Sequence, residues 1–196
     1  MEDKKQEIKK EPKVKSEKNL MRDIYVDKVV VNIGVGESGA ELERAVKILE
    51  LVTKKHGVKT KCKVKLPTWG IRPGLPIGCK TTLRGKEAND FIELTLKAKK
   101  YVMKKKSFSK DGNFSYGIKE YLDVPGIKYN PELGIRGFDV CISLRRKGYR
   151  VKLRKLKYAK VGKKHLITKE DAMNFAKENL KVVIEWVQIQ NQKDQS

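Results

Sequence analysis

Residues 59–66 read KTKCKVKL, a stretch that places a lysine at every second position. Successive side chains of a β-strand point to opposite faces, so a strand here, predicted over 58–65, would have one face of ammonium groups and one mostly apolar face. The lysines are Lys59, Lys61, Lys63 and Lys65, and the residues between them are Thr60, Cys62 and Val64. Neighbouring lysines about 6.8 Å apart repel by about 0.6 kcal/mol in water. Such a row indicates a sheet whose polar face binds a polyanion.

Two other segments separate polar and apolar side chains in the same way. KVVVNIGVG (28–36) and CKTTLRG (79–85) both alternate as strands do. Their polar faces carry Asn32 in the first and Lys80, Thr82 and Arg84 in the second. A later segment, GFDVCISL (137–144), is also predicted to be a strand. Together these strands predict one sheet with a basic, hydrogen-bonding face.

Three helices are predicted beside the strands. ELERAVKILELVTKK (41–55) and KEANDFIELTLKAKKYVM (86–103) have apolar residues at helical spacing. A third helix over 168–180 begins after Thr168, with Asp171 at the capping-box position. An apolar sheet face must be covered by other elements. We therefore predict an α+β fold: an open-faced sandwich of a mostly antiparallel β-sheet with helices packed on one face and a basic opposite face.

The charge distribution points to a polyanionic partner. Lys and Arg number 46 against 24 Asp and Glu, which gives a net charge of +22. Ten Lys or Arg and no acid occur from Leu51 to Lys86, and eleven with no acid occur from Arg145 to Lys164. Nucleic acid is the first candidate partner. The second run provides an auxiliary basic segment: Arg145, Arg146, Lys147, Arg150 and Arg154.

A membrane surface is the weaker alternative. The sequence has no apolar run of 18 residues, no signal-peptide core, and no helix with Lys or Arg opposite Trp, Phe and Leu. Residues 1–19 read as a disordered charged arm, 20–187 as a single RNA-binding domain, and 188–196 as a polar disordered tail. Cys62, Cys79 and Cys141 fit neither a disulfide framework nor a zinc site. We read them as small core residues in a reducing compartment.

An enzymatic alternative rests on GVGESG (34–39), which matches the dinucleotide-binding pattern between a strand and a helix. That pattern requires an acid about twenty residues later, where this chain has lysines. A parallel strand buried on both faces would also not carry alternating lysines. The glycines are better explained by a tight turn. His56 and His165 have no acid or cysteine at ligand spacing. We expect no cofactor, no metal and no catalysis.

RNA is favoured over DNA as the partner. The sequence has no zinc-finger, zipper or recognition-helix pattern. A face that mixes lysine and arginine with asparagine and threonine suits phosphates, 2′-hydroxyls and base edges. Trp69 lies in a Pro- and Gly-rich loop over 67–78, where it could stack on a base or anchor the loop.

Four ordered stretches carry a resemblance to a known family: KVVVNIGVGE (28–37), GIRPGLPIGCKTTLRG (70–85), GNFSYGIKEY (112–121) and PGIKYNPELGIRGFDV (125–140). Over residues 20–180 the chain resembles the fifth large-subunit ribosomal protein family, which binds 5S ribosomal RNA (rRNA). GFDVCISLRRKGYRVKLRK (137–155) and the helix after Thr168 are similar to the archaeal and eukaryotic branch of the family, and the short, Lys-rich ends are similar to its archaeal members. The resemblance implies a non-enzymatic structural component of the large subunit, cytoplasmic and within the ribosome.

The resemblance also implies partners and contact residues. The partners are 5S rRNA, large-subunit rRNA, P-site transfer RNA (tRNA), and other ribosomal proteins of the central protuberance and small-subunit head, with no membrane. The implied rRNA-binding residues are Asn32, Gly34, Thr60, Lys61, Lys63, Lys80, Thr82 and Arg84. A flexible loop over about 65–76 would face tRNA through Lys65, Thr68, Trp69 and Arg72. The family is richer in arginine at 61–65, and lysine cannot copy a bidentate arginine contact.

Overall fold

The computed structural model describes residues 19–185. The charged arm, apart from Asn19, and the polar tail lie outside the described residues. Five strands form an antiparallel sheet in the order β2-β3-β1-β6-β5. Their bounds are β1 Ile24–Gly34, β2 Val58–Lys61, β3 Pro76–Leu83, β5 Phe114–Ile118 and β6 Phe138–Arg146. A separate parallel pair joins β4 (Val102–Lys104) to β7 (Val183–Glu185).

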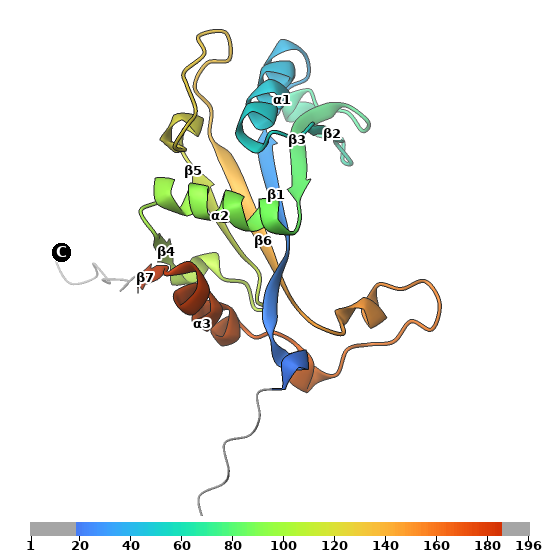
Figure 1. The fold of residues 1–196 in the computed structure, drawn as a ribbon. Coiled ribbons are helices and arrows are strands. Elements are labelled where there is room, and N and C mark those ends of the chain that lie inside the picture. The colour runs from blue at the N-terminus through green and yellow to red at the C-terminus, as the bar shows by residue number, and fades with distance from the viewer. Residues whose placement is uncertain (1–18, 186–196) are drawn as a thin grey trace, which may run out of the picture.

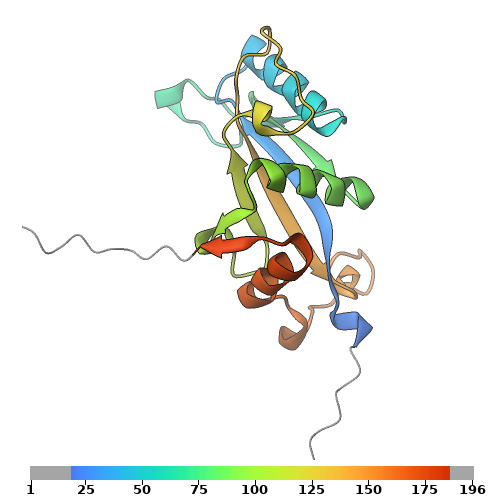
Figure 2. The same cartoon turned by 60° about the vertical axis from the view of Figure 1, so that its left-hand side comes forward.

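Three α-helices accompany the sheet: α1 (Ala40–Thr53), α2 (Lys86–Ala98) and α3 (Lys169–Leu180). Figure 1 shows α1 and α2 lying over one face of the sheet, with α3 and the β4–β7 pair near one end. Figure 2 shows the same layers from the side. The predicted α+β fold with an antiparallel sheet is confirmed.

One face of the sheet supplies most of the core. The buried positions alternate along the strands, and the main ones are Val29, Val31 and Ile33 in β1, Cys79 and Leu83 in β3, and Val140 and Ile142 in β6. Leu42, Ile48 and Leu49 of α1 and Phe91, Ile92 and Leu96 of α2 belong to the same cluster. Burying each of these large side chains contributes about 1.5–3 kcal/mol. The helices therefore close this face and leave the other face of the sheet open.

Several predicted boundaries shift for local reasons. The first helix ends at Thr53, because Lys54 adopts a left-handed conformation with φ of 55°. The second ends at Ala98 rather than continuing to 103, and Lys100 and Tyr101 have φ values of 54° and 58° before β4 begins. The third helix begins as predicted, with Thr168 and Asp171 forming a capping box. The strand β5 was not predicted.

The predicted strand over 58–65 is wrong in its second half, since β2 ends at Lys61. The ladder shifts register between Thr60 and Lys61, which pairs with Pro76. Proline has no N–H to donate, so the regular pattern of ladder hydrogen bonds is interrupted at this pair. The chain then crosses into a loop that Cys62 closes through hydrogen bonds with Leu75 and Gly74.

Cys79 gives the core a measurable pH dependence. The side chain is fully buried, and this burial raises the pKa of its thiol from 9.0 to about 11, against the opposing effect of the Arg136 charge. Between these values the unfolded chain binds fewer protons than the folded chain, so the free energy of unfolding falls as pH rises. We expect a loss of about 2–3 kcal/mol from this group. Urea unfolding from pH 8 to 11 should show a steeper decline for the wild type than for Cys79→Val. Parallel pH profiles would contradict this prediction.

Candidate nucleic-acid interface

The strand register determines which side chains share the open face. Directly paired residues lie on the same face of a sheet. Asn32 pairs with Lys80 on one side and with Asp139 on the other. Val30 pairs with Thr82 and with Cys141, and both partners are exposed. The structure therefore brings together three of the predicted residues, Asn32, Lys80 and Thr82. It also adds an acid, Asp139, that the sequence analysis did not place there.

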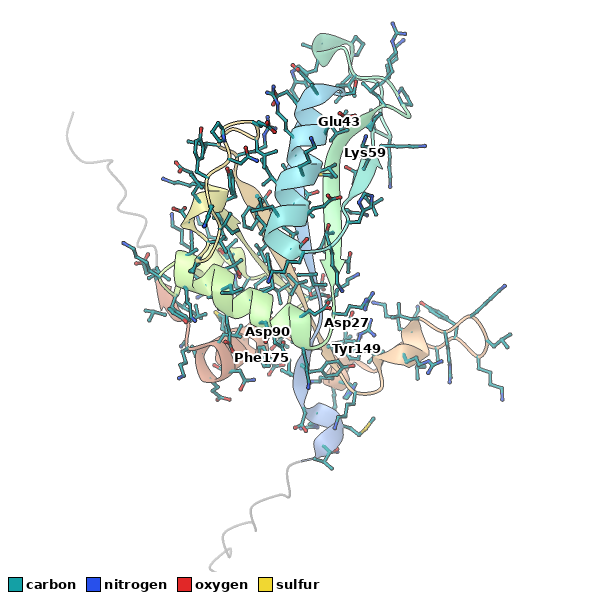
Figure 3. All side chains as sticks on the ribbon, turned by 45° about the horizontal axis from the view of Figure 1, so that its top comes forward. Asp27, Glu43, Lys59, Asp90, Tyr149 and Phe175 are labelled. Atoms are coloured by element: carbon teal, nitrogen blue, oxygen red, sulfur yellow. The ribbon has the colours of Figure 1, made fainter. Side chains whose placement is uncertain are left out.

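A bulge in β1 brings two arginines together on this face. The register between β1 and β6 shifts between Val26 and Lys28, which leaves Asp27 as the extra residue. The Asp27 side chain is only 10% exposed, and its Oδ2 lies 3.1 Å from Nη2 of Arg145. Its Oδ1 lies 3.6 Å from Nη1 of Arg84. The Asp27 carboxylate (labelled in Figure 3) thus holds Arg84 beside Arg145.

The two guanidinium groups keep binding capacity despite their shared acid. Arginine has five N–H donors, and one carboxylate cannot satisfy the donors of two arginines. The Arg84 side chain remains 62% exposed, whereas that of Arg145 is 23% exposed. Arg84 is therefore the more accessible of the pair for a phosphate or a base edge.

The lysine row of KTKCKVKL does not form a four-residue ladder on the open face. Lys59 (labelled in Figure 3) pairs with Cys79, whose side chain faces the helix-covered core. Lys59 therefore lies on the helix side of the sheet and not on the open face. Val58 and Thr60 pair with Lys80 and Gly78 instead. The predicted face assignment is therefore reversed for Val58, Lys59 and Thr60, because one residue of register exchanges the two faces. The register shift after Thr60 then pairs Lys61 with Pro76, in the open-face row of β3.

The remaining predicted residues of this stretch lie at or beyond the end of β2. Lys61 is the last strand residue, and Lys63 and Lys65 lie in the following loop, all three exposed. Val64 is 62% exposed rather than buried, which corrects its expected place on an apolar face. Thr60 lies over Gly78, where an added Cβ would be 3.0 Å from Thr60 Oγ1 and 2.9 Å from the Ile33 carbonyl oxygen. Gly34 pairs with Gly78 in the same row.

The β2–β3 loop (62–75) is a hydrogen-bonded extension of the sheet. The backbone N–H groups of Leu66 and Ile71 each donate to the other's carbonyl oxygen, at 3.0 and 3.1 Å. A 3₁₀ turn, Pro67–Trp69, forms the tip, and Figure 2 shows this tip projecting from the body of the protein. Trp69 is 73% exposed. The other predicted loop residues, Lys65, Thr68 and Arg72, are also exposed.

The auxiliary basic segment divides into three environments. Arg146 is buried: its Nη2 donates to Asp171 at 3.0 Å, and its Nη1 donates to the carbonyl oxygens of His165 and Leu166. We assign it a structural role. Arg145 is held by Asp27 on the open face. The other three residues are exposed, which are Lys147, Arg150 and Arg154.

The loop between β6 and α3 (147–168) projects from the sheet, as the orange segment of Figure 1 shows. Tyr149 closes its base, because its hydroxyl donates to the His165 carbonyl at 3.1 Å and accepts from the Ile167 N–H at 2.9 Å. The Tyr149 and His165 rings also meet edge to face at 5.7 Å. His165 therefore has a packing role at the base of this loop.

The glycine motif forms a turn whose donors already have partners. The N–H groups of Val35 and Gly36 both donate to the carbonyl oxygen of Ile77, at 3.1 and 2.9 Å. These groups are not directed at a phosphate. The preceding strand β1 also has two antiparallel neighbours, whereas a dinucleotide-binding unit has parallel ones. The motif is thus a strand-to-helix turn, as the sequence analysis favoured.

Two other kinds of site are absent from residues 19–185. No group of three His, Cys, Asp or Glu side chains there could hold a metal ion. Among the helices of that range, none is long and apolar enough to cross a membrane.

Two cysteine assignments and several open-face residues need correction. Cys79 is in the core, but Cys62 is half-buried and Cys141 is exposed on the open face. Burial, and then the charge of Asp139, raise the pKa of the Cys141 thiol. Lys28, Ser115 and Ser143 share this face but were not among the predicted contact residues. The signal that could have found Cys141 and Ser143 is the alternation along GFDVCISLRR, which sets them opposite Val140 and Ile142.

The burial of Arg146 generates a stability prediction. Arg146→Ala removes three hydrogen bonds and leaves the Asp171 carboxylate without its guanidinium partner. We expect a loss of about 2–3 kcal/mol, less than for a fully buried pair because the Asp171 side chain is 36% exposed. The matched control, Arg154→Ala, should stay within about 0.5 kcal/mol in urea unfolding. Equal effects of the two substitutions would show that Arg146 has no special structural role.

Comparisons with known proteins agree with this architecture. The family described as "Ribosomal protein L5" matches residues 19–72, and the model of that ribosomal family's C-terminus matches residues 76–175. The large ribosomal subunit protein uL5 of Nanoarchaeum equitans is 47% identical over 165 residues, covering 84% of this chain and 97% of that protein. The uL5 protein of Sulfolobus acidocaldarius is 45% identical, covering 91% and 97%. That of Archaeoglobus fulgidus is 44% identical, covering 85% and 93%.

These matches span nearly the whole described chain, including the sheet, its open face and both projecting loops. The chain therefore belongs to the ribosomal protein uL5 family, a non-enzymatic structural family of the large ribosomal subunit.

Proposed function

We infer that this protein binds 5S rRNA through the open face of its sheet, as part of the central protuberance of the large subunit. The observation that carries this proposal is the grouping of Asn32, Lys80 and Thr82 beside the arginine pair that Asp27 holds. The opposite face is covered by α1 and α2 and cannot meet RNA without unfolding.

Each group on this face suits a different part of an RNA surface. Lys80 and Arg84 can neutralise phosphates, and Arg84 can also donate two parallel hydrogen bonds to a phosphate or a guanine edge. The Asn32 amide and the Thr82 hydroxyl can donate and accept, so they match 2′-hydroxyls and unpaired base edges. Asp139 places a negative charge among them, which disfavours nonspecific contact with a phosphate at that point. The face is therefore better suited to a shaped RNA than to any polyanion.

The β2–β3 loop supports a second contact. Its tip presents Trp69 on a hydrogen-bonded stem, with Lys65 and Arg72 nearby in sequence. An exposed indole on a fixed turn can stack on a base or a ribose, and flanking cations can meet phosphates. The proposal places this tip against P-site tRNA and the small-subunit head, with large-subunit rRNA and neighbouring ribosomal proteins around the body. The protein would act in the cytoplasm, within the ribosome.

A competition experiment tests the 5S assignment. We expect 5S rRNA to bind in preference to excess tRNA at moderate salt. Arg84→Ala should weaken 5S binding by about 1–3 kcal/mol, because it removes the most exposed of the paired guanidinium groups. The control Lys97→Ala removes an exposed cation from α2, on the covered side, and should change affinity much less. Filter binding across a salt series measures both.

Two results of this experiment would contradict the 5S assignment. Equal affinity for 5S rRNA and tRNA, with a log–log salt slope of about −0.7 to −0.9 per phosphate contact, would mean that the +22 charge acts as a generic attraction. Equal losses for Arg84→Ala and Lys97→Ala would place the contact elsewhere.

The loop contact has its own test. Trp69→Ala should leave 5S affinity within about twofold, since the tip lies beyond the open face. In reconstituted large subunits it should weaken P-site tRNA binding by about 1–3 kcal/mol, the range for one base–aromatic stack. Tyr129→Ala is the matched control, because Tyr129 is another exposed aromatic residue, 55% accessible, in a different loop. Unchanged tRNA binding by the Trp69 variant would remove the loop from the proposed contact.

A further inference from the structure

A cavity of about 300 Å³ lies on the β1–β6–β5 side of the open face, away from the β3 edge. Its floor is formed where Val30 pairs with Cys141, Lys28 pairs with Ser143, and Ser115 pairs with Cys141. Residues from the turn before β5 form its wall, notably Ser107, Ser109 and Asn113. This part of the open face borders the Asn32, Lys80, Thr82 and Arg84 group to which 5S binding was assigned, since Val30 also pairs with Thr82.

The lining of this cavity combines an apolar floor with hydrogen-bonding groups at the rim. Four serines line it, and each hydroxyl can donate and accept. The Asn113 Oδ1 accepts hydrogen bonds from Ser143 Oγ at 3.2 Å and from the Leu144 N–H at 3.3 Å. These bonds fix the amide, and its Nδ2 has no partner among residues 19–185. A flat ring with apolar faces and polar edges matches this lining.

A second cavity of about 540 Å³ adjoins the first and shares Asn113 and Ser143 with it. Its lining carries four cations from three segments and one acid, which are Lys110, Arg145, Lys152 and Lys163 with Asp111. Asp27 partly neutralises Arg145, so the three lysines provide most of the free positive charge of this cavity. The second cavity therefore suits phosphate groups, next to a site that suits a ring.

We propose that these joined cavities bind an unpaired strand of RNA, with one base in the serine-lined cavity and the adjacent phosphates against the lysines of the second. The proposal rests on the proposed RNA-binding function and names a second contact on the same protein. A paired base cannot enter, because the edges of a base in an A-form helix are held within the duplex and its major groove is deep and narrow. An unstacked base exposes its edges and can reach the serines.

Cys141 provides a native reporter for occupation of the first cavity. The test uses full-length Cys62→Ser protein, so that Cys141 is the one exposed thiol among residues 19–185. Alkylation by iodoacetamide is followed by mass spectrometry with a saturating random-sequence nine-nucleotide RNA, or with an RNA duplex of equal charge. We expect at least a tenfold slower reaction with the single strand and less than a twofold change with the duplex. Equal protection by both RNAs, or no protection, would overturn the proposal.

Charge variants test the second cavity. Lys152→Glu with Lys163→Glu should weaken single-strand binding at least tenfold. The control pair, Lys47→Glu with Lys97→Glu, makes the same charge change on α1 and α2 and should weaken it less than threefold. All four lysines are exposed, and circular dichroism of each variant would check that it folds. Equal losses for the two pairs would overturn the proposal.

The two proposals fail in distinguishable ways. If 5S rRNA is preferred over tRNA and Arg84→Ala weakens it, while Cys141 stays reactive, the cavity proposal fails and the 5S assignment stands. If Cys141 is protected by the single strand but 5S rRNA shows no preference, the 5S assignment fails and a general single-strand site remains.

Discussion

The pairing of β1 with strands on both of its sides determines the rest of this structure. β3 and β6 fix its register, so Val29, Val31 and Ile33 face the helices while Val30 and Asn32 face outward. A slip of one residue would exchange these two sets and bury the polar residues. The same pairing creates the bulge at Asp27, which joins Arg84 to Arg145 across the sheet. The core and the proposed RNA-binding surface are thus two results of one register.

The open face carries acidic residues at fixed positions among its basic residues. A net charge of +22 disfavours a compact fold through self-repulsion. Asp27 and Asp139 interrupt the positive charge on the sheet, and Asp27 gives Arg84 and Arg145 fixed positions. Much of the remaining basic charge lies on the β6–α3 loop and around the β2–β3 loop, which project from the body. Two loops and one face can therefore meet RNA from different directions.

Local periodicity predicted most of the fold, and long-range pairing accounts for what it missed. The alternation in 28–36 and 79–85 placed Asn32, Lys80 and Thr82 correctly. The alternation in 59–65 failed, because pairing with β3 sets Lys59 opposite the buried Cys79 and the register shifts before Lys61 pairs with Pro76. Arg146 was read from its basic neighbours, although alternation along β6 continues from Leu144 to this buried position. The pairing of Arg84 with Asp27 depends on a bulge, which no single segment specifies.

Lysine footprinting of the protein bound to 5S rRNA tests the central claim, that RNA covers the open face and not the helices. Acetylation rates are compared with and without RNA. The account predicts strong protection of Lys80 and Lys28 on the sheet, with Lys47 and Lys97 on the helices unchanged. Protection of Lys47 and Lys97 equal to that of the sheet lysines would contradict it, because the RNA would then follow the total charge and not the face that the register creates.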